Sequence, residues 1–390
     1  MNVPQLRFKE FSGELSWEKK RLDALGEFKN GLNKGKEDFG FGSPFVNLMD
    51  VFGTDTIQNK FYDLVNASET DLKNYNLLKG DVLFIRSSVK LEGVGQAAVI
   101  VEKLENTVYS GFLIRFREFS KSIELHYKKY CFAHNSFRKK VLALSTTSAN
   151  TNINQDSLSQ LTINLPSLPE QTKIANFLTT IDERINQLTR KKELMTQYKQ
   201  GVMQQIFSQQ LRFKDDNGED FGDWEEKKLG ELCKITTGKL DANAMVAGGK
   251  YRFYTCAKDF YHIDKYAFDT NALLISGNGA NVGYIHHFNG KFNAYQRTYV
   301  LDGFNDNIIF VKFYLDLKLS ARIATEKKEG NTPYIVMNTL TDMPIFLPCI
   351  PEQTKIANFL TALDEKIQHI TQQIEATKQY KQGLLQQMFV

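Results

Sequence analysis

The sequence predicts a mixed α/β protein: two globular domains joined by two long antiparallel coiled-coil helices, with a pseudo-two-fold internal repeat. Three observations predict this fold class. An eleven-residue segment recurs unchanged 182 positions later, a helical apolar spacing follows each copy, and short strand-like runs precede each copy. The length of 390 residues agrees, because roughly 150 residues per domain gives two or three domains.

The repeat is exact where it begins. Residues 169–179 recur at 351–361, and the register then holds without a gap, so that 197–201 returns at 379–383. Such self-similarity at a fixed offset indicates two copies of one structural unit.

A second, weaker repeat opens each half. Residues 5–9 resemble 210–214, and Trp17 matches Trp224 at an offset of 207. The stretch between this opening and the helical repeat is therefore 25 residues longer in the first half, so similar ends enclose divergent middles. Position 390 maps onto position 208, and the residues after 208 resemble the N-terminus. We therefore expect a ring of two similar halves, cut between positions 390 and 1.

The helical repeats predict one long helix in each of the segments 166–208 and 347–390. Pro169 and Pro351 suit a first helical turn, where a missing N–H costs nothing, and Glu170 and Glu352 complement the positive helix end. A helix of about 39 residues is roughly 58 Å long and, if amphipathic, needs a partner of equal length. The other copy is such a partner; the alternative is that each helix lies on the surface of its own domain. The apolar positions with 3,4 spacing are Ile174, Leu178, Ile181, Ile185 and Leu188 in the first copy and Ile356, Leu360, Leu363, Ile367 and Ile370 in the second.

The segments 1–165 and 209–346 predict the two globular domains. Short apolar runs such as 81–85 and 272–275 are typical of strands, and Gly and Asn turns separate them. We expect mixed α/β domains.

Composition and motifs exclude several classes of protein. The 49 Lys and Arg nearly balance 45 Asp and Glu, giving a net charge of +4, so any nucleic-acid site must be local. The four cysteines lie far apart in sequence and predict no zinc pair. We find no catalytic motif, no metal-ligand pattern, and no apolar stretch long enough for a membrane span, and we expect a soluble, cytoplasmic protein.

A two-fold protein with divergent domains suits a bipartite, asymmetric DNA site. Residues 103–144 contain nine Lys and Arg against three acids, as a phosphate-binding patch would, although a solvated helical face is the alternative. Polar loops at 86–90 and 276–281 each follow a predicted strand, and arginine and asparagine commonly read guanine and adenine. A glycine-rich nucleotide loop at 277–283 is disfavoured because its spacing is wrong. The candidate DNA-binding residues are Lys34, Lys36, Arg86, Ser87, Ser88, Lys90, Arg115, Lys139, Lys140, Lys239, Ser276, Asn278, Asn281 and Arg297.

The duplicated motif L-P-x-x-P-E-Q-T-K-I-A-x-F-L, at 165–178 and 347–360, closely resembles the conserved regions of specificity (S) subunits of type I restriction-modification enzymes. The resemblance covers essentially the whole chain. It implies two target recognition domains, 1–165 and 209–346, that each read one half of a split DNA site. It also implies that the helical spacers 166–208 and 347–390 set the gap between the half-sites.

The same resemblance implies the partners. They are double-stranded DNA, two methyltransferase (modification) subunits that dock on the helices, and two ATP-dependent restriction/translocase subunits. S-adenosylmethionine, ATP and Mg²⁺ would belong to those partners, so this chain would be non-catalytic and hold no cofactor or metal. Two alternatives from other classes remain: a stand-alone DNA-modifying enzyme with a fused specificity domain, and a coiled-coil scaffold without DNA binding.

Overall fold

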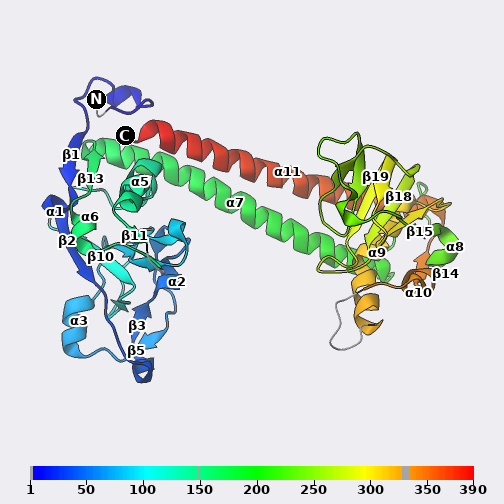
Figure 1. The fold of residues 1–390 in the computed structure, drawn as a ribbon, viewed down its shortest axis with the longest axis horizontal. Helices are drawn as coiled ribbons and strands as arrows, with labels where there is room; N and C mark the ends of the chain where they lie inside the picture. The colour runs from blue at the N-terminus through cyan, green and yellow to red at the C-terminus, as the bar shows by residue number, and fades with distance from the viewer. Residues whose placement is uncertain (1–2, 148–149, 327–333) are drawn as a thin grey trace. The chain divides into compact units, whose positions relative to one another are not determined.

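The computed structural model describes residues 3–147, 150–326 and 334–390. The chain divides into unit 1, residues 1–188 and 373–390, and unit 2, residues 189–372. Each unit combines one globule with part of the helix α7 (Leu168–Phe207) and part of the helix α11 (Ile350–Met388) (Figure 1). The two helices lie inside the predicted spacers 166–208 and 347–390, and the predicted fold class is confirmed. No helix among the described residues is both long and apolar enough to cross a membrane.

Unit 1 is built on a five-stranded sheet of order β2-β10-β6-β8-β4, in which only the pair β4–β8 is parallel. Its strands are β2 (Gly26–Asn30), β4 (Thr56–Ile57), β6 (Val82–Ile85), β8 (Ala97–Ile100) and β10 (Leu113–Glu118). One smaller sheet has the order β5-β3-β9, with β5 at Leu64–Val65, β3 at Phe39–Val46 and β9 at Val108–Tyr109. Another has the order β11-β12-β7, with β11 at Thr146–Thr147, β12 at Thr151–Asn152 and β7 at Ser87–Ser88. The short helices are α1 (Leu22–Leu25), α2 (Leu48–Val51), α3 (Glu69–Tyr75), α4 (Tyr127–Ala133), α5 (Asn135–Ala143) and α6 (Gln155–Ser159), with 3₁₀ turns at Lys9–Phe11, Lys36–Asp38 and Leu91–Gly93.

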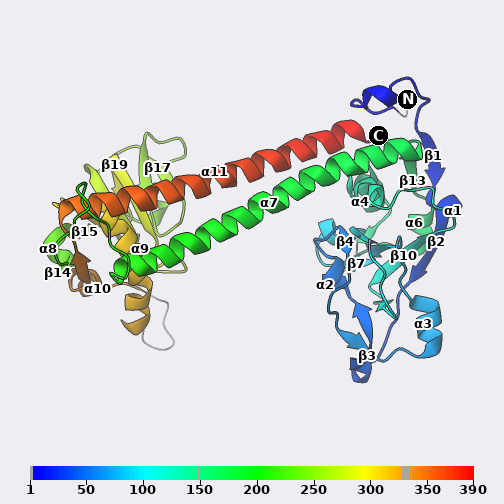
Figure 2. The same ribbon diagram turned by 180° about the vertical axis from the view of Figure 1, so that it is seen from behind.

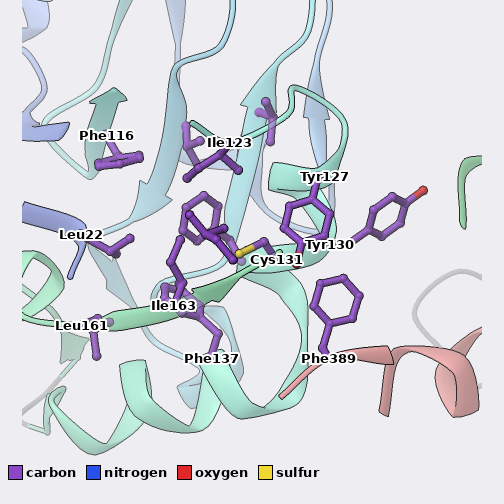
Figure 3. Packing of buried hydrophobic residues seen from close by; sticks show 14 of the residues in the cluster. Leu22, Phe116, Ile123, Tyr127, Tyr130, Cys131, Phe137, Leu161, Ile163 and Phe389 are labelled. Atoms are coloured by element: carbon purple, nitrogen blue, oxygen red, sulfur yellow. The ribbon is translucent and has the colours of Figure 1, made fainter. Parts of the chain in front are cut away.

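The sheet of unit 1 is buried on both faces. All four residues of β6 are buried; Val82 and Phe84 face one core and the intervening Leu83 faces the other. The first core is closed by α4, α5, the beginning of α7 and the end of α11. Figure 3 shows Phe389 near Tyr127, and their rings stack with centroids 5.5 Å apart. The end of α11 is therefore part of the unit 1 core.

Unit 2 has a six-stranded sheet of order β15-β20-β18-β19-β16-β17, in which β16–β19 is the parallel pair (Figure 2). Its strands are β15 (Lys234–Thr237), β16 (Tyr251–Tyr254), β17 (Tyr261–Ile263), β18 (Phe268–Ser276), β19 (Ile285–Ala294) and β20 (Thr298–Asp302). Its helices are α8 (Leu229–Leu232), α9 (Ile308–Glu326) and α10 (Met337–Thr341), with a 3₁₀ turn at Ala242–Ala244. Its main core joins α9 and one sheet face to the end of α7 and the beginning of α11.

The divergent middles share one topology. Numbered along the chain, the five strands of the unit 1 sheet lie in the order 1-5-3-4-2, and five strands of unit 2 lie in the same order, with β17 added at one edge. The parallel pair occupies the same place in both sheets. The mixed α/β domains expected from the sequence are thus two versions of one fold.

A two-stranded ladder leads into each long helix. In unit 1, β1 (Glu18–Arg21) pairs antiparallel with β13 (Thr162–Leu165), and in unit 2, β14 (Glu225–Lys228) pairs with β21 (Pro344–Leu347). These ladders join the two ends of each globule at the beginning of α7 or α11.

The expected ring organisation is also found. In unit 1 the N–H of Leu6 donates to the carbonyl of Gln387 at 2.9 Å, and in unit 2 the N–H of Leu211 donates to the carbonyl of Gln205 at 3.1 Å. Position 387 is the repeat counterpart of position 205. The segment around Leu6 therefore takes, in unit 1, the place that the segment after α7 takes in unit 2.

Candidate nucleic-acid interface

Antiparallel pairing brings several of the predicted residues to one edge of each sheet. In unit 1, β2 and β6 end where β10 begins. In unit 2, β15 and β18 end where β20 begins. We call these places edge 1 and edge 2. Edge 1 comprises residues 31–36, 86–90 and 111–112, and edge 2 comprises residues 238–240, 276–281 and 296–297.

Edge 1 presents one half-buried arginine among lysines. Lys34 pairs with Asp71 at 2.9 Å, and this bond raises the pKa of Lys34 and lowers that of Asp71. Lys36 is exposed. Nη1 of Arg86 donates to the carbonyl of Gly111 over 3.4 Å, a long bond, and within the part of the chain that the structure describes the other guanidinium donors make no hydrogen bond.

The prediction that 86–90 is a loop is wrong for two of its residues. Ser87 and Ser88 form β7, which pairs with β12. The Ser88 hydroxyl accepts from the N–H of Lys90 at 3.2 Å, and the Lys90 side chain is exposed. Lys90 is therefore better placed than either serine to reach a ligand.

The basic stretch 103–144 is not one continuous patch. The Arg115 side chain is only 3% exposed and pairs with Glu27 at 3.2 Å, which corrects its prediction as a DNA contact. Arg117 and Lys129 form ion pairs with Asp81 and Asp182, respectively. These acids lie outside the basic stretch in sequence, so counting charges within the stretch overstated its free positive charge.

The two predicted lysines of α5 differ from each other. Lys139 is exposed. Lys140 is partly buried, its Nζ donates to the carbonyl of Thr162 at 3.1 Å, and burial lowers its pKa. Both belong to helix α5 and not to the loops of edge 1, so the structure does not bring them together with Arg86.

Edge 2 contains one exposed arginine and several amides. Arg297 and Lys239 are exposed. Asn278 pairs with Tyr334 through its backbone, in an isolated antiparallel β-bridge. Asn281 donates its side-chain N–H to the carbonyl of Cys256 at 3.0 Å. A hollow of about 370 Å³ lies at this edge, lined by Thr237, Gly277, Gln296, Arg297, Tyr299, Tyr334 and Ile335.

Ser276 corrects another prediction. It is the last residue of β18, not part of the loop, and it is fully buried. Its hydroxyl has no hydrogen-bond partner among the described residues. It therefore cannot contact DNA in this conformation.

A buried clamp, which the sequence patterns did not predict, holds the beginning of each long helix. In unit 1 the Glu170 carboxylate accepts two bonds of 2.8 Å from Arg7 and one of 3.4 Å from the indole of Trp17. Glu170 is 0% exposed. This geometry, rather than the helix dipole alone, explains why the first helical turn has a glutamate.

Unit 2 repeats the clamp. Glu352 is also 0% exposed and accepts bonds of 3.1 and 2.7 Å from Arg212 and one of 3.2 Å from Trp224. The sequence signal that could have revealed the clamp is the joint recurrence of Arg, Trp and Glu in both halves. Its members come from the opening repeat and the helical repeat, so it ties the two ends of each globule together.

The glutamine after each clamp glutamate is buried and ties the helix to its globule. Gln171 accepts from the N–H of Glu124 at 2.8 Å, and Gln353 accepts from the N–H of Asn307 at 2.9 Å. Glu124 lies just before α4 and Asn307 just before α9. The Pro-Glu-Gln triplet of the repeat therefore positions the globules on their helices.

The helices also repeat one ion pair. In unit 1, Asp182 of α7 pairs with Lys381 of α11, and in unit 2, Lys199 of α7 pairs with Asp364 of α11 at 2.5 Å. Both the aspartates and the lysines are related by the offset of 182. Each unit thus holds its two helix segments antiparallel through equivalent residues.

Comparison with known proteins agrees with this duplicated arrangement. A model of the type I restriction modification DNA specificity domain matches residues 14–196 and again residues 222–379. The chain belongs to this family. The two matches correspond to the two halves of the internal repeat, and the resemblance proposed from the sequence is confirmed.

Curated relatives of this specificity-domain family match parts of the chain or all of it. The EcoDI specificity subunit of Escherichia coli is 43% identical over 157 residues, which are 40% of this chain and 33% of that protein. A putative type I specificity subunit of Mycoplasma genitalium is 22% identical over 99% of this chain and 96% of its own length. The chain spans about a third to a half of the first three curated relatives, at 33%, 54% and 39% of their lengths.

Solved structures of specificity subunits share the fold of this family member. The S subunit of a type I restriction-modification system from M. genitalium gives a TM-score of 0.63 at 17% identity, covering 100% of this chain and 99% of that one. A chain from a study of type I complex assembly and conformational transition gives 0.60 at 16% identity over 95% and 96%.

Proposed function

We propose that this chain is the DNA sequence-recognition subunit of a type I restriction-modification complex. The globule of unit 1 reads one half of a bipartite, asymmetric DNA site through edge 1, and the globule of unit 2 reads the other half through edge 2. The helices α7 and α11 set the unread gap. We expect the chain to recognise DNA, to leave the chemistry to its partner subunits, and to be cytoplasmic.

One observation supports this proposal above the others. Two globules of the same topology differ at the same sheet edge, whereas the clamps that hold them to their helices are the same. An exposed or half-buried cation occurs at each edge, as phosphate and base contacts require. Two domains that read different DNA sequences need the same attachment to the helices and different residues at the sheet edge that contacts DNA.

The partners follow from the proposal. Double-stranded DNA is the ligand, two methyltransferase subunits dock on the helices, and two restriction/translocase subunits complete the assembly. S-adenosylmethionine, ATP and Mg²⁺ are expected on those subunits. The buried clamp and the helix ion pairs are used inside the chain, so docking must use other helix faces.

Two experiments separate the proposal from its alternatives. A stand-alone modifying enzyme would transfer labelled methyl groups from S-adenosylmethionine to DNA as an isolated chain, and we expect no transfer. A scaffold without DNA binding would show no DNA affinity that falls with salt. We expect such salt dependence, because cations at the edges release counterions from phosphates.

The direct test is an exchange of one globule. Residues 26–160 are replaced by the equivalent segment of another specificity subunit, which leaves Arg7, Trp17 and Glu170 in place. Methylated positions are then mapped in cells that contain the modification subunits. We expect only one half of the DNA site to change. A change in both halves would contradict independent reading.

A further inference from the structure

The two edges can be matched through backbone hydrogen bonds, without using side-chain similarity. At edge 1 the N–H of Arg86, just after β6, donates to the carbonyl of Phe112 at 2.8 Å. The carbonyl of Arg86 accepts from the N–H of Ile153 at 2.9 Å. These two bonds define the position of Arg86 in the fold.

Edge 2 has the same two bonds with different residues. The N–H of Gly277, just after β18, donates to the carbonyl of Arg297 at 2.8 Å, and its carbonyl accepts from Ile335 at 2.8 Å. Ile335 lies 182 positions after its counterpart at edge 1, the offset of the helical repeat. Gly277 therefore takes the position of Arg86, and Arg297 takes the position of Phe112.

At edge 1 the arginine is the residue whose N–H donates this backbone hydrogen bond, whereas at edge 2 the arginine is the residue whose carbonyl accepts it. Steric contact explains why. A Cβ on Gly277 would lie 2.3 Å from the carbonyl oxygen of Arg297 and 2.9 Å from the ring of Tyr299. In unit 1 the position of Tyr299 is held by Ile114, which has no ring, so the ring contact is absent beside the strand that ends at Arg86. A side chain excluded from one strand of edge 2 is thus supplied from the facing strand.

Among the described residues, neither Arg86 nor Arg297 forms an ion pair. Arg86 makes one long bond to a carbonyl, and Arg297 stands beside the hollow of edge 2. Both retain the paired donors that fit O6 and N7 of guanine in the major groove.

We propose that Arg297 does at edge 2 what Arg86 does at edge 1, each reading one guanine in the half-site of its own domain. The inference rests on the proposed function, and it adds the base that is read and the residue that reads it. The two domains then use one reading position, supplied from either of two facing strands.

The test uses the complete modification complex. Its site is mapped by methylation, and competition binding compares duplexes in which each guanine of the site is replaced in turn. Arg86→Ala should lower discrimination at one guanine of the first half-site by about tenfold or more, and Arg297→Ala should do the same at one guanine of the second. Arg297→Lys should not restore discrimination, because lysine lacks the bidentate fork.

A transfer variant tests the equivalence of the two positions. Arg86→Gly alone should lose the guanine preference, and Arg86→Gly with Phe112→Arg should regain it, since the arginine then comes from the strand used at edge 2. As matched controls, Lys36→Ala and Lys239→Ala, exposed lysines of the same edges, should weaken binding of all duplexes alike.

The outcomes are distinguishable. A wild-type complex without sequence preference would overturn the proposed function and this inference together. A sequence-specific wild type whose Arg297→Ala variant keeps its full preference, or weakens uniformly, would overturn only the inference. So would an Arg86→Gly, Phe112→Arg variant that regains no guanine preference.

Discussion

Among single residues, the buried clamp glutamates Glu170 and Glu352 occupy equivalent positions of the eleven-residue segment that both halves share unchanged. Glu170→Ala leaves the Arg7 guanidinium, whose side chain is 7% exposed, with only its longer ion pair to Glu14 at 3.8 Å. We expect unit 1 to lose about 3 kcal/mol of unfolding free energy, toward the lower end of the cost of breaking a buried ion pair. Glu352→Ala should cost unit 2 less, because its partner Arg212 is 24% exposed.

The two tryptophans allow each clamp to be measured by itself. The chain has only Trp17 and Trp224, one in each clamp. Urea unfolding followed by fluorescence reports unit 1 in a Trp224→Phe background and unit 2 in a Trp17→Phe background. Glu183→Ala, an exposed glutamate on α7, is the control. A Glu170→Ala loss no larger than that of this control would contradict the clamp.

A second residue-scale prediction concerns pH. Burial lowers the pKa of His134 to about 4, with Lys140 contributing, and the ring stacks on Phe389. The unfolded chain takes up this proton near pH 6.5, whereas the folded chain does so only near pH 4. Unit 1 should therefore lose stability as pH falls through this window, by about 1.4 kcal/mol per pH unit.

The variants for this pH test are His134→Gln and His126→Gln, the latter replacing an exposed histidine of the same unit. Urea unfolding at pH 7 and pH 5 should show a reduced pH dependence for His134→Gln and an unchanged one for His126→Gln. Equal pH dependence in both variants would show that His134 is not the source.

Among the helices and strands, the two long helices and the strand runs at 81–85 and 272–275 could be predicted from the sequence, and the strand order could not. An exact repeat and 3,4 apolar spacing are local signals, and they predicted α7 and α11 to within three residues at each end. The shared strand order depends on non-local pairing, such as β2 with β10, which one sequence does not reveal. The 25-residue difference in length between the middles hid their common topology.

The candidate site was predicted only in part, for a related reason. The strand-end loop 86–90 gave Arg86 as a candidate, and Arg297 was a candidate outside the predicted loops. Backbone hydrogen bonds place Arg86 on one strand of edge 1 and Arg297 on the opposite strand of the equivalent edge 2. The contact of either arginine with DNA stays a prediction. Counting charges in sequence could not reveal that Arg115 pairs with Glu27 inside the domain. Burial and pairing of charged groups depend on tertiary contacts, so they had to come from the structure.

An element-scale prediction concerns the helices as a spacer. Seven residues inserted into each helix, after 190 and after 372, leave both repeated ion pairs intact and nearly preserve the helical face. The insertion adds about 10.5 Å. At roughly 3.4 Å per base pair, the unread gap should grow by about three base pairs. Methylation mapping gives the spacer length directly, and an unchanged spacer would reject this role of the helices.

At the scale of the whole molecule, the repeat implies that half the chain contains a complete set of contacts. A fragment of residues 1–208 has Asp182 and Lys199, and Lys199 is the counterpart of Lys381. Ile206 and Phe207 are likewise the counterparts of Met388 and Phe389, which close the core of unit 1. A second copy of the fragment can therefore supply the contacts that α11 supplies in unit 1, and pairing would cover the apolar seam of α7.

The fragment should form a homodimer with a true two-fold axis, and its DNA target should become an interrupted palindrome of the first half-site. Lys192 opposes this association, because its counterpart is the buried Ile374. Lys192→Ile should accordingly strengthen the dimer. Its dissociation constant, measured by sedimentation, compares the two fragments, and a weaker Lys192→Ile dimer would contradict the proposed pairing.

In the proposed arrangement, two globules of one fold read DNA independently and are joined by a duplicated frame. Methylation mapping with the 1–208 fragment and its modification subunits examines this arrangement without the second globule. We expect methylation at a symmetric site made of the first half-site and its reverse complement. A fragment that stays monomeric, or that assembles but still methylates the asymmetric site of the full chain, would contradict it.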